Sequence, residues 1–166
     1  MITEKENKFK GYHRLDELTI QKKSGKKVKR EFLTNKDGVS AIVYNSKLDK
    51  YIFVSQWRPS LNGYMTEVVA GSIEIGETPE QAIKKEVIEE VGYKCDNIKF
   101  LTKCYVSPGV ISEFIYIYYV EVSEQISSGG GLDSEDEEID IIYMTKEEML
   151  NYEFLDAKTQ LGIKLL

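Results

Sequence analysis

Residues 71–93 read GSIEIGETPEQAIKKEVIEEVGY, and this stretch decides what the 166-residue chain can fold into. Its later part predicts a helix from residue 79 to about residue 91. Thr78 can cap the start through a capping box with Gln81, and Pro79 suits the first helical position. Gly92 favours the end of the helix there, because glycine readily adopts the left-handed conformation of a helix C-terminus.

Three glutamates share one face of this helix. Glu86, Glu89 and Glu90 stand at positions i, i+3 and i+4, beside an apolar stripe that would pack on a sheet. Like charges at this spacing cost a few tenths of a kcal/mol per pair, and a divalent cation would remove that cost. Carboxylate oxygens are the ligands that Mg²⁺ prefers. Taken alone, the glutamates fit either a metal site or an ordinary solvated helix face.

The wider spacing resembles the Nudix box, G-x5-E-x7-R-E-U-x-E-E-x-G-U, in which U is aliphatic. Gly71, Glu77 and Gly92 stand at the matching positions around the three glutamates. Two positions depart from the pattern, because Lys85 replaces the usual Arg and Tyr93 fills an aliphatic position. Lysine lacks the bidentate fork of arginine, so we expect it to orient a glutamate less tightly. The resemblance implies the α+β Nudix fold, a mixed β-sheet sandwiched between helices (α/β/α).

The resemblance also implies a site for Mg²⁺, with Mn²⁺ as the alternative. By motif position, Glu86 and Glu90 are the expected metal ligands, joined by the backbone carbonyl of Ala70. Glu89 is expected to act beside them in catalysis, as a further ligand or as an electrostatic partner. Glu77 is expected to tie the loop to the helix.

Three further stretches resemble one branch of that family, the ADP-ribose pyrophosphatases and the similar GDP-mannose hydrolases. They are QWRP at 56–59, EVVAG at 67–71 and SPG at 107–109. Arg58 is expected to clamp the diphosphate of the substrate, since a planar guanidinium suits phosphate oxygens. Glu67, Pro108 and Gly109 are expected to contact the substrate as well. Without the resemblance, Arg58 reads as a surface residue at a strand end and 107–109 as an ordinary turn.

The first 36 residues are basic and predict a β-hairpin. They hold 11 basic and 5 acidic residues, whereas residues 37–166 hold 11 and 23, which gives the net charge of −6. Strands at 12–20 and 28–33 flank a turn at Ser24-Gly25. We therefore expect an N-terminal hairpin region at 1–36 and a Nudix hydrolase domain at 37–166.

A two-stranded hairpin is marginal alone, so it must pack on the rest of the fold or on another subunit. The resemblance implies that it crosses to the partner of a homodimer, where Tyr12 and Arg30 hold the nucleobase by stacking and cation–π contact. A frayed, solvated terminus is the alternative.

Six carboxylates fall within residues 133–140, after a Ser-Ser-Gly-Gly-Gly run that we expect to be flexible. The segment resembles the catalytic loop of the same branch. Glu137 is then an additional metal ligand, and Glu135 the general base that activates water. A disordered acidic loop is the alternative.

Runs rich in β-forming residues predict the remaining strands, and two capped segments predict short helices. The strands are expected at 39–44, 51–56, 65–69, 98–106, 114–122 and 139–144. A second T-x-x-E box, from Thr145 to Glu148, opens one helix, and a last helix runs from about Asp156 to the C-terminus.

Composition excludes several other classes of protein. A single histidine, His13, excludes His-rich zinc sites, and two cysteines form no disulfide framework. The longest apolar run, 114–120, is far short of the roughly 20 residues that cross a bilayer. We expect a cytoplasmic protein without a membrane partner. The acidic balance disfavours nucleic acid, including a role in cap removal.

These observations predict a homodimeric, Mg²⁺-dependent hydrolase of nucleoside diphosphate sugars. ADP-ribose is the preferred substrate, giving AMP and ribose 5-phosphate. GDP-mannose or another nucleotide sugar is the nearest alternative. A nucleotide-sugar-binding regulator without catalysis is the alternative from another class.

Overall fold

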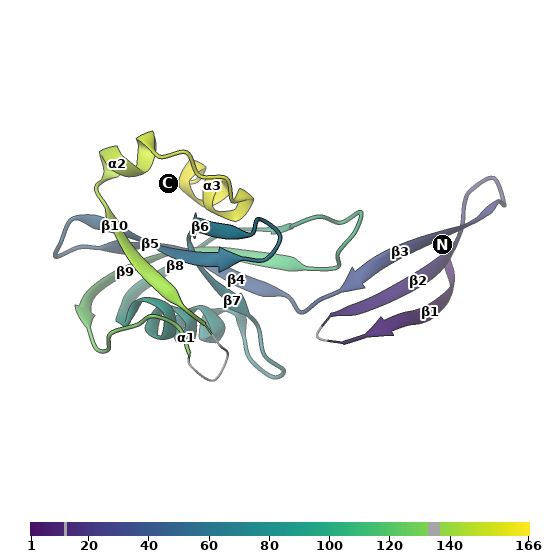
Figure 1. The fold of residues 1–166 in the computed structure, drawn as a ribbon, viewed down its shortest axis with the longest axis horizontal. Coiled ribbons are helices and arrows are strands. Elements are labelled where there is room, and N and C mark those ends of the chain that lie inside the picture. The colour runs from purple at the N-terminus through teal and green to yellow at the C-terminus, as the bar shows by residue number, and fades with distance from the viewer. Residues whose placement is uncertain (12, 133–136) are drawn as a thin grey trace. The chain divides into compact units, whose positions relative to one another are not determined.

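The computed structural model describes residues 1–11, 13–132 and 137–166. The chain forms two compact units (Figure 1). One consists of Met1–Asp37 with Cys104–Phe114, and the other of Gly38–Lys103 with Ile115–Leu166. The division into regions 1–36 and 37–166 stays a prediction.

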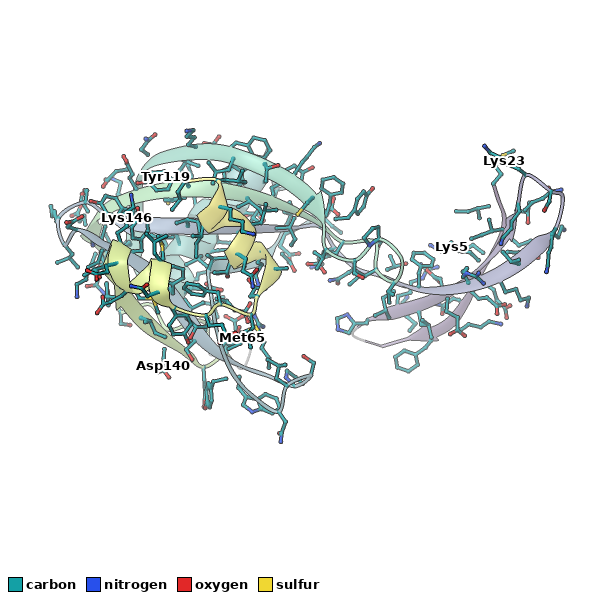
Figure 2. All side chains as sticks on the ribbon, turned by 90° about the horizontal axis from the view of Figure 1, so that it is seen from above. Lys5, Lys23, Met65, Tyr119, Asp140 and Lys146 are labelled. Carbon is teal, nitrogen blue, oxygen red and sulfur yellow. The ribbon has the colours of Figure 1, made fainter. Side chains whose placement is uncertain are left out.

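The smaller unit contains a 3-stranded antiparallel sheet of β1 (Ile2–Lys10), β2 (Arg14–Gln21) and β3 (Lys27–Thr34), in that order. Strands β2 and β3 confirm the expected hairpin, with Gly25 in the turn at φ 83°. Strand β1 was not expected, because its residues are exposed throughout and show no apolar alternation. Lys5 on β1 and Lys23 in the turn mark this sheet in Figure 2.

A buried carboxylate joins the three strands of this sheet. The Asp16 side chain is fully buried and accepts from Asn7 Nδ2 at 3.1 Å, Arg14 Nε at 2.8 Å and Thr34 Oγ1 at 2.8 Å. Lys5 Nζ lies 3.0 Å from its Oδ2. Burial acts to raise the pKa of Asp16, but these donors outweigh it and hold the pKa well below its usual range. Long-range polar contacts therefore fix β1, which lacks an apolar pattern.

The larger unit is built on a 7-stranded sheet. Its strands are β4 (Gly38–Asn45), β5 (Lys50–Arg58), β6 (Gly63–Glu67), β7 (Val69–Ser72), β8 (Tyr93–Tyr105), β9 (Phe114–Gln125) and β10 (Ile139–Met144). The order is β10-β5-β4-β9-β8, with β6 beside β5 and β7 beside β4. Strands β4 and β9 run parallel, whereas β4–β5, β5–β10, β5–β6 and β4–β7 are antiparallel. The sheet is mixed, as expected.

The strand expected at 65–69 is divided at Val68. Strand β6 pairs with β5 and β7 pairs with β4, so the chain changes partner at this residue. The backbone N–H of Val68 leaves the ladder and donates instead to Thr159 Oγ1 at 3.0 Å. The expectation of one continuous strand was wrong, because an acceptor 91 residues away replaces the ladder bond.

Helices cover both faces of the large sheet. Helix α1 (Pro79–Val91) packs on one face, and α2 (Lys146–Asn151) and α3 (Ala157–Lys164) on the other (Figure 1). The large sheet has a hydrophobic core on each face, and successive side chains of the central strands point into one core or the other. Ala41 and Val43 face α1, whereas Ile42 between them faces the C-terminal helices. The sandwich of helices around a mixed sheet is confirmed. Within the described ranges no helix has the length and hydrophobicity to cross a membrane.

Candidate active site

Helix α1 is fixed at both ends by the residues expected from its sequence. Thr78 and Gln81 form a complete capping box. Gly92 ends the helix at φ 77°, and its backbone N–H donates to the carbonyl oxygen of Ile88. Ala82, Ile83, Val87 and Val91 bury the apolar stripe in the core. The register of the glutamate face is therefore set by local capping together with packing on the sheet.

The carboxylate of Glu86 lies directly against the backbone of Gly71. A Cβ built on Gly71 would come within 2.1 Å of the Glu86 carboxyl carbon. Only glycine leaves room for this carboxylate, which explains the first position of the motif in physical terms.

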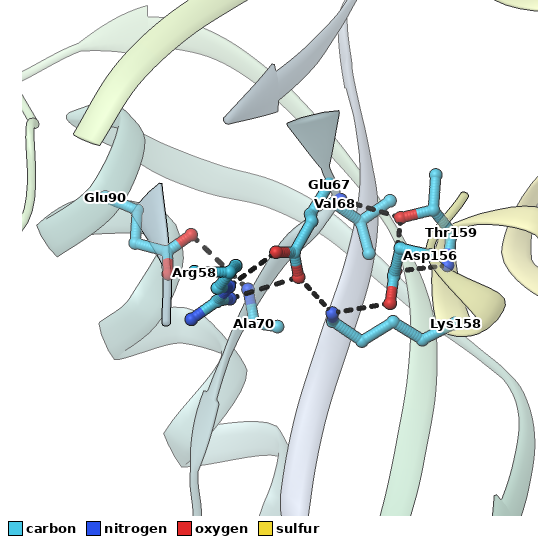
Figure 3. Close-up of polar contacts among 8 residues, drawn as sticks. All are labelled: Arg58, Glu67, Val68, Ala70, Glu90, Asp156, Lys158 and Thr159. Carbon is cyan, nitrogen blue, oxygen red and sulfur yellow. Dashed lines mark hydrogen bonds and ion pairs between the residues drawn. The ribbon is translucent and has the colours of Figure 1, made fainter. Parts of the chain in front are cut away.

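Glu90 lies in the interior beside the same strand. It is only 4% exposed, and its Oε2 accepts from the backbone N–H of Ala70 at 3.3 Å (Figure 3). Burial raises the pKa of Glu90 well above its usual value, and the negative charge of Glu86 raises it further. The Ala70 N–H lowers the pKa, Glu137 raises it and Arg58 lowers it. Glu86, Glu137 and Arg58 therefore each lie within electrostatic reach of Glu90.

Lys85 forms ion pairs with two of the box glutamates. Its Nζ is 3.8 Å from Glu86 Oε1 and 3.7 Å from Glu89 Oε2. Whether lysine orients these glutamates less tightly than arginine would stays a prediction. Glu77 holds the preceding loop, because its Oε2 accepts from the backbone N–H of Glu74 at 3.0 Å.

The glycine run that precedes the acidic segment caps the end of α1. Gly129, Gly130 and Gly131 have φ values of 65°, 102° and 86°, a left-handed conformation that favours glycine. Gly130 N donates to Glu90 O at 2.9 Å and Gly131 N to Glu89 O at 3.1 Å. The expectation of a flexible lead-in was wrong, because the unpaired carbonyls at the helix end bind this run.

Leu132 and Glu137, on either side of the segment that the structure does not describe, contact each other. Leu132 N donates to Glu137 Oε2 at 3.3 Å, and the Cβ of Glu137 packs close to Gly131. Glu137 thereby comes within electrostatic reach of Glu90. The predicted base, Glu135, lies outside the described residues.

An ion-pair network links the predicted clamp residue to α3 (Figure 3). Arg58 donates from Nε to Glu67 Oε1 at 2.6 Å and from Nη2 to Glu67 Oε2 at 3.0 Å. Lys158 Nζ binds Glu67 Oε2 and also lies 3.0 Å from Asp156 Oδ1. Burial acts to raise the pKa of Glu67, but Arg58 and Lys158 outweigh it and lower the pKa. Glu67 therefore stands as a charged, buried link between Arg58 and Lys158.

Sequence reasoning missed Lys158 and Thr159 in this region. Asp156 was expected only as the start of the last helix, and it does cap α3 by accepting from Thr159 N at 2.9 Å. No spacing in the sequence relates these residues to Glu67. The helix cap at Asp156 was the one local signal in the sequence for a polar network at the start of α3.

The residues present fit a divalent cation by their chemistry. Hard oxygen donors are available from Glu86, Glu90, Glu137 and the carbonyl of Ala70, and a cation would offset the burial of like charges around Glu90. As they stand, the residues that the structure describes contain no cluster of three or more His, Cys, Asp or Glu side chains able to hold a metal. Mg²⁺ commonly keeps several waters and uses one or two carboxylates, so such a cluster is not a requirement.

The other predicted substrate residues belong to the smaller unit. Arg30 is exposed on β3, and its Nη1 donates to Lys29 O at 2.8 Å. Pro108 and Gly109 form a turn closed by Val110 N donating to Ser107 O at 3.0 Å. Tyr12 lies outside the described part of the chain. The contacts of these residues with a substrate stay predictions.

Comparison with known proteins identifies the family of the fold. The NUDIX domain matches residues 34–161. The chain is 31% identical over 151 residues to the methanol dehydrogenase activator of Bacillus methanolicus and to the ADP-ribose pyrophosphatase of Bacillus subtilis. In both cases 89% of this chain and 80% of the relative are covered.

Two further comparisons extend over more of the chain. The GDP-mannose pyrophosphatase of Shigella flexneri is 31% identical over 169 residues, covering 93% of this chain and 88% of the relative. A crystal structure of an ADP compounds hydrolase matches 99% of this chain and 90% of its own, with a TM-score of 0.85 and 19% identity. That solved structure supports the fold.

Proposed function

Because the chain belongs to the NUDIX domain family, we propose that it hydrolyses the diphosphate of a nucleoside diphosphate sugar in the presence of Mg²⁺. The substrate proposed is ADP-ribose. Water adds to one phosphorus and the bridging P–O bond breaks, which gives AMP and ribose 5-phosphate. Mn²⁺ is the proposed alternative ion.

The observation that carries this proposal is a buried carboxylate, Glu90, which accepts from the backbone N–H of Ala70 at 3.3 Å and lies within electrostatic reach of Glu86, Glu137 and Arg58. The pKa of Glu90 responds first to burial, then to Glu86, and also to Glu137 and Arg58. A concentration of negative charge around a buried carboxylate is unfavourable unless a cation uses it. The nearby Arg58 suits the anionic group of the substrate.

The residue roles follow the chemistry of these groups. Glu86, Glu90, Glu137 and the Ala70 carbonyl would hold the metal, which when bound neutralises phosphate charge and lowers the pKa of water. Glu135 takes the proton of the attacking water, and Glu89 supports the site beside Glu86. Arg58 orients the diphosphate, with Glu67 fixing the guanidinium.

Binding of the nucleobase and formation of a dimer are proposed for the N-terminal region and the turn at 107–109. Tyr12 and Arg30 hold the base, Pro108 and Gly109 line the substrate, and the N-terminal sheet joins two copies into a homodimer. Sedimentation velocity of the purified chain tests the dimer, and a monomer at micromolar concentration contradicts it.

The cysteines of the described chain are free, which agrees with the proposed cytoplasmic location.

Two other functions remain alternatives to ADP-ribose hydrolysis. GDP-mannose is favoured by the similarity to proteins named GDP-mannose pyrophosphatase. A regulator that binds nucleotide sugars without catalysis is the alternative from another class, and one similar protein is named an activator. The intact set of box glutamates favours catalysis over regulation.

A substrate screen separates these alternatives. The purified protein is incubated with Mg²⁺ and ADP-ribose, GDP-mannose, UDP-glucose or a diadenosine polyphosphate, and products are quantified by chromatography. ADP-ribose is expected to turn over fastest. Faster turnover of GDP-mannose replaces the substrate while keeping the reaction, and binding without turnover favours the regulator.

Box variants test whether catalysis occurs at this site. Glu86→Gln and Glu90→Gln each keep the shape of the side chain and are expected to lower kcat by about 10²-fold or more. The control is Glu80→Gln, on the same helix, whose exposed side chain pairs with Lys84 at 2.6 Å. Full activity of both box variants would place the chemistry elsewhere.

A further inference from the structure

The C-terminal helix supplies a cation to the network behind Arg58. Lys158 stands on α3, whereas Arg58 ends β5 and Glu67 ends β6. Lys158 and Arg58 bind the same carboxylate from two directions (Figure 3). The Glu67 side chain is 3% exposed, so both cations bind a buried carboxylate.

The geometry of this carboxylate fixes the orientation of the guanidinium. Glu67 receives Nε and Nη2 of Arg58 along one edge, at 2.6 and 3.0 Å. A guanidinium has five N–H donors, so this bidentate pair leaves three for another acceptor. The Arg58 side chain is 37% exposed, which lets a ligand reach it.

Lys158 also sets the charge of the group. Arg58 and Lys158 carry two positive charges, and Glu67 and Asp156 carry two negative charges, so the four side chains are neutral together. Loss of Lys158 leaves this group with one net negative charge beside Arg58. An anionic diphosphate would then meet a less favourable field, and Glu67 would lose one of the donors that hold its carboxylate.

Stability alone is a weak reason for this arrangement. Buried ion pairs often contribute little, because desolvation offsets the attraction between the charges. Asp156 already caps α3 through Thr159, and Thr159 already joins α3 to Val68, both without Lys158. α3 is therefore held in place without Lys158. What Lys158 adds is a hydrogen bond to the Glu67 carboxylate, which in turn binds Arg58.

We propose that Lys158 is a positioning residue for the diphosphate, acting through Glu67 to orient Arg58 and to keep its surroundings receptive to an anion. This inference rests on the proposed function, since it assigns Arg58 to the diphosphate. In this proposal Lys158 acts on the diphosphate through Glu67 and Arg58.

The test is a set of variants measured for turnover and for binding. Lys158→Met removes the charge and the donor, and Lys158→Arg retains both. The matched control is Lys164→Met, an exposed lysine on the same helix. Each protein is assayed with ADP-ribose and with GDP-mannose in Mg²⁺ for kcat and KM, by calorimetry for binding of both nucleotides without metal, and by thermal unfolding.

The variant K158M is expected to raise KM by about tenfold, with kcat changed by less than about threefold. K158R is expected to recover most of the affinity, and K164M to match the wild type. In an Arg58→Met background, K158M is expected to have no further effect on KM, because its action passes through Arg58. A purely structural role predicts lower thermal stability and losses that add to that of Arg58→Met.

Each outcome bears on the inference or on the function. If the wild type turns over a nucleotide sugar and K158M keeps its KM, the inference fails while the function stands. If the wild type binds but does not hydrolyse, a weaker Kd in K158M upholds the inference and an unchanged Kd overturns it. A wild type that neither binds nor hydrolyses overturns both. If K158M does not fold, Lys158→Gln takes its place, since it keeps a donor and removes only the charge.

Discussion

The contact between Gly71 and Glu86 gives a sharp test of the site. Replacing Gly71 with alanine adds one carbon at a position 2.1 Å from the Glu86 carboxyl carbon and 2.2 and 2.4 Å from its oxygens. Ordinary van der Waals contacts begin at about 3.4 Å, so the carboxylate has to move by more than about 1 Å. The carboxylate is the far end of a flexible side chain, so it can turn away while the backbone stays in place.

The size of the expected loss follows from this displacement. A misplacement of about 1 Å in a catalytic site can cost about 10²-fold in rate. We therefore expect Gly71→Ala to lower kcat/KM by about 100-fold, which corresponds to about 2.7 kcal/mol. The melting temperature is expected to stay within a few degrees of the wild type, because no buried apolar contact is lost.

The assay couples hydrolysis to alkaline phosphatase, which releases phosphate from the monoester products and not from the intact diphosphate. Gly63→Ala is the matched control, since a Cβ on this strand glycine would meet nothing closer than Leu61 O at 3.8 Å. In a Glu86→Gln background, where the carboxylate charge is already gone, Gly71→Ala is expected to cause little further loss.

Two results would refute this reasoning. If Gly71→Ala keeps activity within about threefold of the wild type, the position of the Glu86 carboxylate does not matter for the reaction. If activity falls only in step with the melting temperature, the loss comes from unfolding and not from displacement of Glu86.

Three further predictions concern stability and reactivity. Thr159→Val removes the acceptor for the buried Val68 N–H and is expected to cost about 1–3 kcal/mol in urea unfolding, whereas an unchanged midpoint would show that this bond is dispensable. Asp16→Asn is expected to lower the melting temperature at pH 7. Because the pKa of Asp16 is lowered by folding, its stabilisation is fully present above the ordinary carboxyl pKa of about 4 and is lost progressively as the pH falls from there toward the lower pKa of the folded state. The difference between Asp16→Asn and the wild type should therefore shrink between pH 5 and pH 3 in melts followed by circular dichroism, and a growing difference would contradict the assignment. Burial raises the pKa of Cys95 to about 11, so only about one thiol in a thousand is ionised at pH 8. Iodoacetamide should label Cys95 at least about tenfold faster in urea than in the folded protein by mass spectrometry, and equal rates would argue against its burial.

Features fixed by neighbouring residues could be predicted from the sequence. Helix α1 is specified within its own length by the Thr78 capping box, the apolar stripe and Gly92, and the structure agrees at both ends. Five of the six strands expected in the large sheet, all except 65–69, match strands of the structure, because their apolar residues are buried on its two faces. The resemblance to the Nudix box located Glu86 and Glu90, which the structure brings together.

Features fixed by distant residues could not be predicted. Strand β1 has no apolar pattern that would predict it, and it is held by antiparallel pairing with β2 and by polar contacts to Asp16. The division at Val68 depends on Thr159, and the second cation on Glu67 comes from Lys158. In each case the partner lies far away in the chain, and the residues around either position do not predict the contact.

The crowding of negative charge around Glu90 limits how the sequence can change. Glutamine at this position would keep an acceptor for the Ala70 N–H and remove a buried charge. The Glu90→Gln variant should therefore have a higher free energy of unfolding than the natural protein. Selection for stability alone would therefore favour losing these carboxylates one at a time. We therefore expect Glu90→Gln to gain stability while it loses a proposed metal ligand, so stability and the proposed chemistry oppose each other at this position.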